Sequence, residues 1–144
     1  MAEDAINQAI EKAGLPVKNC PTEDLKIHGG GENSERFGDL AIYGTDAEKI
    51  QQLIEENPRL AEKLHEDLPY CAAEIVWAIR FEMAHTVEDV LARRTRALFL
   101  DARAAVQIAP RVAEIMAREM GKDNAWINAQ IEKFNETAKN YLPL

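Results

Sequence analysis

The sequence predicts an all-α protein, a single domain of six or seven helices around one buried central helix. Two observations support this fold class. Apolar residues recur at the spacing of one helical face through most of the chain, and capping residues, glycines and prolines divide that pattern into segments of helical length. At 144 residues, the chain has the length of one domain.

The amino-terminal part is predicted to be a helix followed by a long loop. Residues 2–13 have an apolar face that Gly14 and Pro16 bring to an end, which indicates an amphipathic helix. Residues 15–44 show no sustained period and are rich in glycine, proline, asparagine and aspartate, so we expect an irregular loop with one short extended piece at 25–27. The expected parts of the single domain 1–144 are a helix at 1–14, a loop at 15–44 and a helical core at 45–144.

Helix boundaries in the core are marked by capping residues and prolines. Thr45–Glu48 and Thr86–Asp89 have the spacing in which a threonine and an acidic residue cap each other's backbone amides. Pro58 and Pro69 separate the first helices, and Asp123 is a candidate N-cap after Gly121. The expected helices cover about 45–57, 59–65, 70–84, 86–96 and 98–120, with a last helix after Asp123.

The central helix is predicted at residues 70–84, which are apolar on almost every side. Glu74, Arg80 and Glu82 are its only charged residues. A helix of that composition is buried, and buried carboxylates need partners. Seven of the nine arginines and none of the eight lysines lie between Arg80 and Arg118, and guanidinium groups hold carboxylates or phosphates bidentately.

We therefore predict a structural ion-pair cluster, in which at least one of Arg93, Arg94 and Arg96 holds Glu74 or Glu82. Helical geometry puts Arg93 and Arg96 near one face and Arg94 about 100° from Arg93, so one face turns inward and the other outward. The members of the cluster are Glu74, Arg80, Glu82, Asp89, Arg93, Arg94 and Arg96. An anion or nucleic-acid site on the same arginines is the alternative, although the apolar residues 97–105 leave little room for a protruding recognition helix.

Two adjoining segments resemble a known family. Residues 73–84, AEIVWAIRFEMA, and 86–96, TVEDVLARRTR, resemble the C-terminal helical domain of FAD-dependent, quinone-linked glycerol-3-phosphate dehydrogenases. The similarity extends to 100–105 and to 1–6, which resembles the helix that follows a Gly-Gly-Lys-x-Thr-Thr-Tyr-Arg cofactor loop in the family. That loop is absent here, so we expect an excised or separately encoded C-terminal domain.

This resemblance implies a function for the parent enzyme. The parent oxidises sn-glycerol 3-phosphate to dihydroxyacetone phosphate, passing hydride to FAD and electrons to a quinone at the membrane. Flavin and substrate contacts lie in the preceding domains of such enzymes, so the resemblance implies an accessory or structural domain with no catalytic, cofactor-binding or metal-binding residue. The implied partners are the FAD and substrate domains; membrane association would come only through the parent, and a homo-oligomer stays open.

Charge and cysteine content narrow the function classes. The net charge is −8, and residues 1–79 hold 7 basic against 16 acidic side chains, whereas 80–118 hold 7 against 5. A mainly acidic surface disfavours non-specific binding of nucleic acid or anionic lipid. Cys20 and Cys71 lack metal-ligand spacing, which suits a reducing compartment, and no signal peptide is visible. We therefore expect a cytoplasmic protein, with the parent at the cytoplasmic face of the membrane.

Other functions rest on weaker patterns. His28–Gly31, His-Gly-Gly-Gly, has the composition of an esterase oxyanion loop or part of a dinucleotide fingerprint, but no Gly-x-Ser-x-Gly turn or βαβ pattern accompanies it, and a flexible turn is simpler. Glu62–His65 and Glu82–His85 share the Glu-x-x-His spacing of di-iron bundles, on segments too short for ligand helices. A helical interaction or nucleic-acid-binding module and a di-iron carboxylate bundle remain the alternatives.

Overall fold

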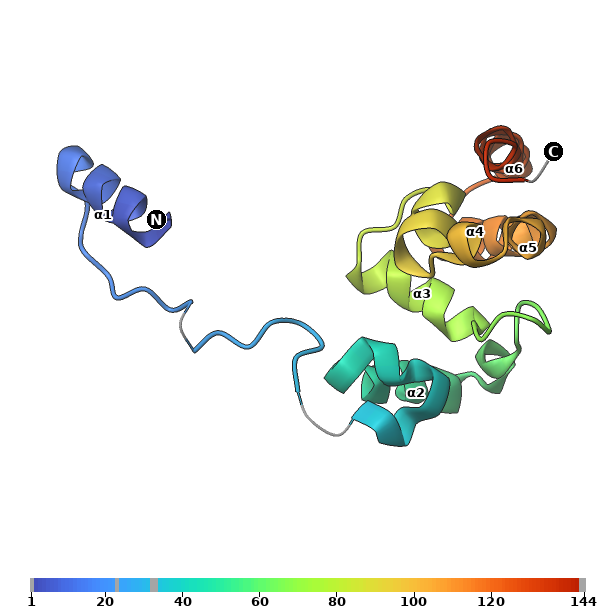
Figure 1. The fold of residues 1–144 in the computed structure, drawn as a ribbon, viewed down its shortest axis with the longest axis horizontal. Helices are drawn as coiled ribbons and strands as arrows, with labels where there is room; N and C mark the ends of the chain where they lie inside the picture. Colours follow the sequence, from blue (N-terminus) through green and yellow to red (C-terminus); the bar gives the residue numbers. More distant parts are fainter. Residues whose placement is uncertain (1, 23, 32–33, 143–144) are drawn as a thin grey trace.

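The computed structural model describes residues 2–22, 24–31 and 34–142, and these residues confirm the all-α prediction (Figure 1). Within the described part of the chain, an isolated bridge between Lys63 and Cys71 is the only extended pairing. The elements are the α-helices α1 (Ala2–Ala13), α2 (Ala47–Glu56), α3 (Ala72–Phe81), α4 (Ala97–Leu100), α5 (Ala102–Met120) and α6 (Asn124–Ala138), the 3₁₀-helices η1 (Ser34–Asp46) and η2 (Pro58–Ala61), and the π-helix η3 (Asp89–Arg94).

Helix α3 is the buried central helix that the sequence predicts. It lies between α2 on one side and α4 and α5 on the other (Figure 1). Its residues from Ala72 to Ala78 are all buried. Ile75 belongs to a larger hydrophobic cluster with the carboxyl-terminal helices, whereas Trp77 belongs to a smaller cluster with η1 and α2. The helix is therefore apolar on all sides because it separates two cores.

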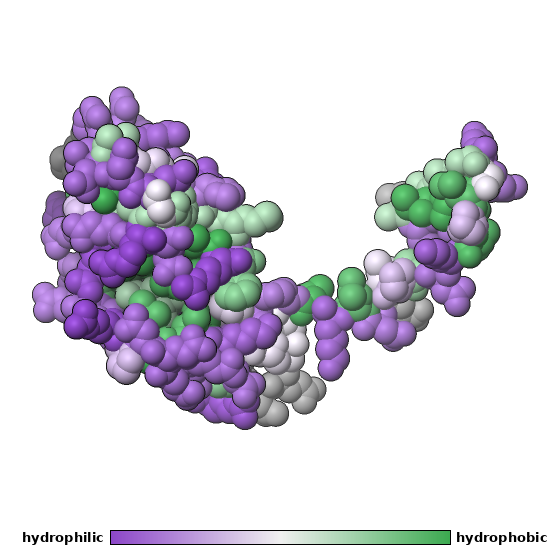
Figure 2. All heavy atoms as spheres, turned by 180° about the vertical axis from the view of Figure 1, so that it is seen from behind, coloured by the Kyte–Doolittle hydropathy of each residue, from purple (hydrophilic) through white to green (hydrophobic). Residues whose placement is uncertain are grey.

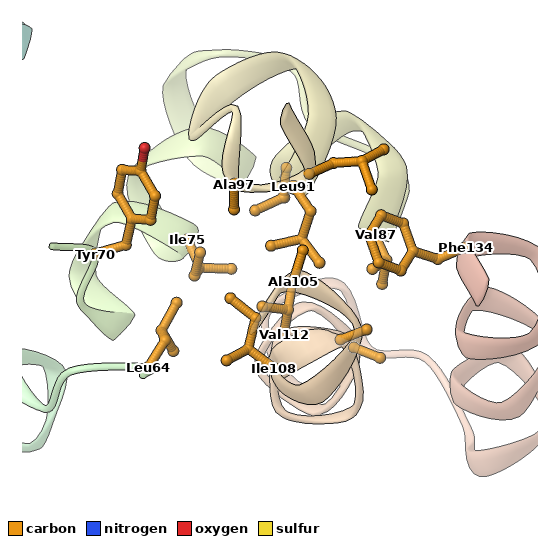
Figure 3. Close-up of a cluster of buried hydrophobic side chains, with 14 of the residues drawn as sticks. Leu64, Tyr70, Ile75, Val87, Leu91, Ala97, Ala105, Ile108, Val112 and Phe134 are labelled. Carbon is orange, nitrogen blue, oxygen red and sulfur yellow. The ribbon is translucent and has the colours of Figure 1, made fainter. Parts of the chain in front are cut away.

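The larger core is built around α5. The buried residues of this helix recur every three or four positions from Ala104 to Ala117, so one face turns inward along its whole length. Figure 3 shows Ile108 on this face, below Ile75, while Phe134 reaches in from α6 beside Val87. This packing places the arginine-bearing helix η3 against the end of α3.

The expected helix at 98–120 is interrupted at Asp101. Helix α4 ends at Leu100, and Asp101 takes an extended conformation with φ −151° and ψ 98°. Its Oδ1 accepts hydrogen bonds from the amides of Arg103 and Ala104, both at 2.9 Å. Aspartate is a preferred N-cap, so it starts a new helix here instead of continuing the previous one.

The expected loop at 15–44 is shorter than predicted, because η1 begins at Ser34. Gly38 and Gly44 interrupt this helix with φ of 57°, which hides its period in the sequence. Because η1 leads directly into α2, the predicted capping box at Thr45–Glu48 does not form, and Asp46 occupies the N-cap without a capping hydrogen bond from its side chain to the helix backbone. No strand is present at 25–27. The capping box at Thr86–Asp89 does form, with two bonds of 3.0 Å.

Helix α1 stands apart from the other helices, at the end of an extended segment (Figure 1). None of its residues is buried, and the Ile6 side chain is 60% exposed. Figure 2 shows apolar side chains gathered on the surface of this detached lobe. Of the helices in the described ranges, none has the length and apolar character that crossing a membrane requires.

Candidate functional site

The predicted ion-pair cluster is divided into separate contacts around α3 and η3. Arg80 pairs with Glu119 of α5, with 2.7 Å between Nη2 and Oε2. Arg93 pairs with Glu88 at 2.7 Å and with Asp89 at 3.1 Å. Both arginine side chains are about half exposed, at 46% and 52%. These are surface pairs, which contribute little to stability.

Arg94 is the arginine that turns inward. Its Nε and Nη2 donate to the backbone carbonyl oxygen of Glu82 at 3.1 and 2.5 Å, and Nε lies 3.6 Å from the Glu82 carboxylate. The second oxygen of the Glu82 carboxylate, Oε1, accepts a hydrogen bond of 3.1 Å from the Trp77 indole N–H. Met83, the next residue, has a left-handed φ of 56°. The Arg94 guanidinium group therefore binds the carbonyl end of α3 and fixes the strained turn that follows it.

Glu74 has no arginine partner within the described residues, so of the two carboxylates named in the prediction it is Glu82 that meets an arginine. Its carboxylate is 2% exposed and accepts bonds from the Tyr43 hydroxyl at 3.1 Å and the Cys71 amide at 2.7 Å. Glu74 lies three residues after the N-cap Cys71, so its carboxylate turns back to the unpaired amides and the positive end of the helix dipole.

The environment raises the pKa values of both Glu74 and Tyr43. Burial raises the pKa of Glu74, although the hydrogen bonds from Cys71 and Tyr43 oppose the shift. Burial also raises the pKa of Tyr43, and the neighbouring Glu74 charge adds to it. The Tyr43 phenol therefore stays protonated and donates its hydrogen bond to the buried Glu74 carboxyl group. The sequence contained one signal for this role, a glutamate three residues after a cap position, but cysteine in place of serine obscured it.

Arg96 occupies a different position from the one expected. The helix η3 is wider than an α-helix, because the carbonyl of Val90 accepts both the amide and the hydroxyl of Thr95, five residues later, at 2.9 and 3.0 Å. Arg96 lies beyond its end with φ 59°, so Arg93 and Arg96 do not share a helical face. In the described part of the chain, no carboxylate pairs with Arg96.

Asp89 serves as the partner of the Thr86 cap. Burial acts to raise the pKa of Asp89, but hydrogen bonds with Thr86 and the His85 amide, together with the Arg93 charge, outweigh it and lower the pKa. This carboxylate therefore stabilises the start of the arginine-bearing segment.

The two Glu-x-x-His pairs lie in unrelated contacts. Glu62 pairs with Arg111, and His65 contacts Gln107 at 2.9 Å. Glu82 contacts Arg94, as described above. No group of three or more potential metal-ligating side chains occurs within residues 2–22, 24–31 and 34–142.

The His28–Gly31 segment lies against η1. His28 pairs through Nδ1 with Asp46, whose other oxygen accepts a bond of 3.0 Å from Lys49. The imidazole lies 6.0 Å from the Trp77 ring, which stacks on Phe81 at 4.3 Å. The segment that the sequence predicts as a flexible turn thus contacts the smaller hydrophobic cluster, to which Trp77 belongs.

Comparison with known proteins shows similarity to one part of several glycerol phosphate enzymes. The family model of the C-terminal domain of alpha-glycerophosphate oxidase matches residues 20–127. The chain is 32% identical to a probable mitochondrial glycerol-3-phosphate dehydrogenase of Caenorhabditis elegans, over 92% of the chain and 21% of the relative. It is also 32% identical to the mitochondrial glycerol-3-phosphate dehydrogenase of Bos taurus, over 99% of the chain and 22% of the relative. No solved structure matches significantly.

Two consequences follow from these relatives. The chain spans about a fifth of their length. The expected cytoplasmic location is wrong, because these relatives, like that of Arabidopsis thaliana at 27% identity over 98% of the chain and 27% of the relative, are named as mitochondrial enzymes.

Proposed function

Because the chain belongs to the family of C-terminal domains of alpha-glycerophosphate oxidase, we propose that it is the accessory C-terminal domain of an FAD-dependent mitochondrial glycerol-3-phosphate dehydrogenase. The observation that carries this proposal is the match over residues 20–127, in a chain that aligns over almost its whole length with a fifth of much longer dehydrogenases. The parent oxidises sn-glycerol 3-phosphate to dihydroxyacetone phosphate and passes the electrons through FAD to a quinone.

The residues of this chain do not fit the FAD itself. A dinucleotide cofactor is held by a βαβ unit and a glycine-rich turn at a helix amino terminus. The described residues form helices without such a unit, and η1 fills the space beside both glycines, with the Tyr43 backbone at Gly29 and the Thr45 side chain at Gly31. We therefore place the flavin and the catalytic residues in the other domains of the parent, and give this chain no step of the reaction.

The contribution of this domain is structural. Arg94 and the Glu74–Tyr43 pair fix the two ends of α3, on which both cores depend. The unburied helix α1 supports a contact with the FAD and substrate domains, since an apolar helical face is normally covered. The net charge of −8 supports neither nucleic-acid binding nor a direct contact with anionic lipid, so membrane association would come through the parent.

A domain exchange tests this proposal. The chain would replace the corresponding carboxyl-terminal segment of the bovine relative, and dye reduction by glycerol 3-phosphate would be compared with that of a bovine enzyme lacking the segment. We expect the exchanged enzyme to retain FAD and activity that the deletion loses. An exchanged enzyme no more active than the deletion would contradict the proposal.

The isolated chain provides a second measurement. Titration with FAD should leave the flavin fluorescence unchanged, because the residues that hold a dinucleotide are missing. Stoichiometric quenching would show that this domain holds the cofactor and would require a different assignment of roles.

A further inference from the structure

We propose that η1 and the end of α3 form a docking site for the chain's own His28–Gly31 segment, and that this contact is the anchor from which the amino-terminal arm leaves the core. The arm is defined as residues 2–22 and 24–27. This inference concerns the organisation of the chain itself and does not depend on the proposed function.

The anchor begins with a close crossing of two backbones. The Thr45 amide donates to the Gly29 carbonyl oxygen at 3.1 Å, and the Thr45 hydroxyl donates to that of Gly30 at 3.4 Å. A Cβ on Gly44 would lie 1.8 Å from the Gly29 oxygen, and a Cβ on Gly29 would lie 2.9 Å from the Tyr43 oxygen. Both glycines also have left-handed φ, of 57° and 74°. The crossing therefore excludes side chains from both segments.

Side chains then give the crossing its specificity. Asp46 is only 6% exposed and needs partners, which are His28 and Lys49. The same imidazole lies beside the indole of Trp77, and Lys49 lies 5.9 Å from that ring. The docked segment thus supplies one of the two side chains that pair with a buried carboxylate.

The arm has little other attachment to the core. Its described residues are exposed, apart from a partly buried Ile10, and α1 buries none. The buried members of both hydrophobic clusters come from Leu40 onward. Releasing the anchor should therefore free the arm without unfolding the helices.

Gly44→Ala tests the anchor, with Gly38→Ala as its matched control. Both glycines have φ 57°, so both variants carry the strain of a left-handed alanine, but a Cβ on Gly38 meets nothing within 4 Å. We expect hydrogen exchange at the Thr45 amide, which donates across the crossing, to be about tenfold faster in Gly44→Ala than in Gly38→Ala, with α5 unchanged in both. In a Trp126→Phe background, the fluorescence of Trp77 should also change in Gly44→Ala as His28 leaves it.

A second pair of variants decides the matter even if Gly44→Ala fails to fold. A Cβ on Gly31 would lie 2.2 Å from the Thr45 methyl carbon, with no other atom closer than 3.6 Å. Gly31→Ala should speed exchange of the amide at position 45, whereas the double variant with Thr45→Ser, which removes the methyl and keeps the hydroxyl, should return it close to the parent rate. If Gly31→Ala exchanges at the parent rate, or if Thr45→Ser does not repair it, the anchor is not the contact proposed here.

Discussion

Helices α1 and α3 are similar in length, at 12 and 10 residues, but they are stabilised in opposite ways. In α1, Glu3 and Asp4 occupy the first turn and Lys12 the last, a distribution that favours the helix locally, yet no residue is buried. In α3, seven residues are buried, so packing on both sides supplies most of its stability. The comparison shows that local interactions alone hold one helix, whereas tertiary packing stabilises the other.

The difference also explains why α1 needs a partner. A helix of about 12 residues is marginally stable in water when nothing packs against it. Its apolar side chains, including Ile6, remain exposed in this chain. Under the proposed function, the other domains of the parent supply the missing contact, as α5 and α2 do for α3.

The largest expected contrast between the two helices is in hydrogen exchange. Amides in the middle of α3 open only with the whole domain, so their protection reflects a global stability of about 5 to 15 kcal/mol. Those of α1 open locally. We expect protection in α3 to exceed that in α1 by a factor of about 1,000 or more, measured residue by residue by NMR. Comparable protection in both helices would mean that α1 packs on the core.

Matched isoleucine truncations sharpen the comparison. Ile75→Ala in α3 removes a fully buried side chain and should lower the free energy of unfolding by about 2 to 5 kcal/mol. Ile6→Ala in α1 removes a side chain that is 60% exposed and should change it by less than about 0.5 kcal/mol. Urea unfolding measures both. A large effect of Ile6→Ala would contradict the separation of the two regions.

The sequence predicted what depends on local signals. The buried α3, the Thr86 cap and the start of α6 at Asp123 were all found, because each rests on composition or on residues three or four positions apart. The glycine interruptions of η1 were not, since glycine does not distinguish a kinked helix from a loop.

The details of the site depended on contacts that span long stretches of chain. Tyr43, the partner of Glu74, lies 31 residues away in a segment expected to be irregular. The π-helical geometry that removes Arg96 from the face of Arg93 depends on Thr95 and leaves no regular spacing in the sequence. An inward and an outward arginine were predicted, but which residue took which place was not.

The two arginines next to each other in η3 test whether the end of α3 depends on a specific partner. Arg94→Ala removes two bonds to the Glu82 carbonyl oxygen and should cost about 1 to 3 kcal/mol of stability. Arg93→Ala breaks surface pairs and should cost less than about 1 kcal/mol. Thermal melting compares them.

A negative result for the arginines would have a clear meaning. If the alanine variants of Arg93, Arg94 and Arg96 all melt within a degree or two of the parent, and the triple variant instead loses affinity for DNA or inorganic phosphate, the arginines form a binding site and not a structural one.

The smallest expected effect is a pH dependence at the amino end of α3. Because burial raises the pKa of Glu74 above its ordinary value of 4.5, the folded state binds this proton more tightly than the unfolded state does. The stabilising contribution is fully present below pH 4.5 and is lost as the pH rises through the folded-state pKa. The pH dependence from Asp89 has the opposite sign. Its pKa is lowered from 3.8, so its contribution to stability is present above that pH and is lost as the pH falls through the folded-state pKa.

Unfolding free energies measured by urea from pH 3 to 8 should therefore move apart in opposite directions for Glu74→Gln and Asp89→Asn, each relative to the parent. Parallel curves for the parent and Glu74→Gln would show that this carboxyl group titrates alike in the folded and unfolded chain, and that its burial against Tyr43 is not as tight as the 3.1 Å bond indicates.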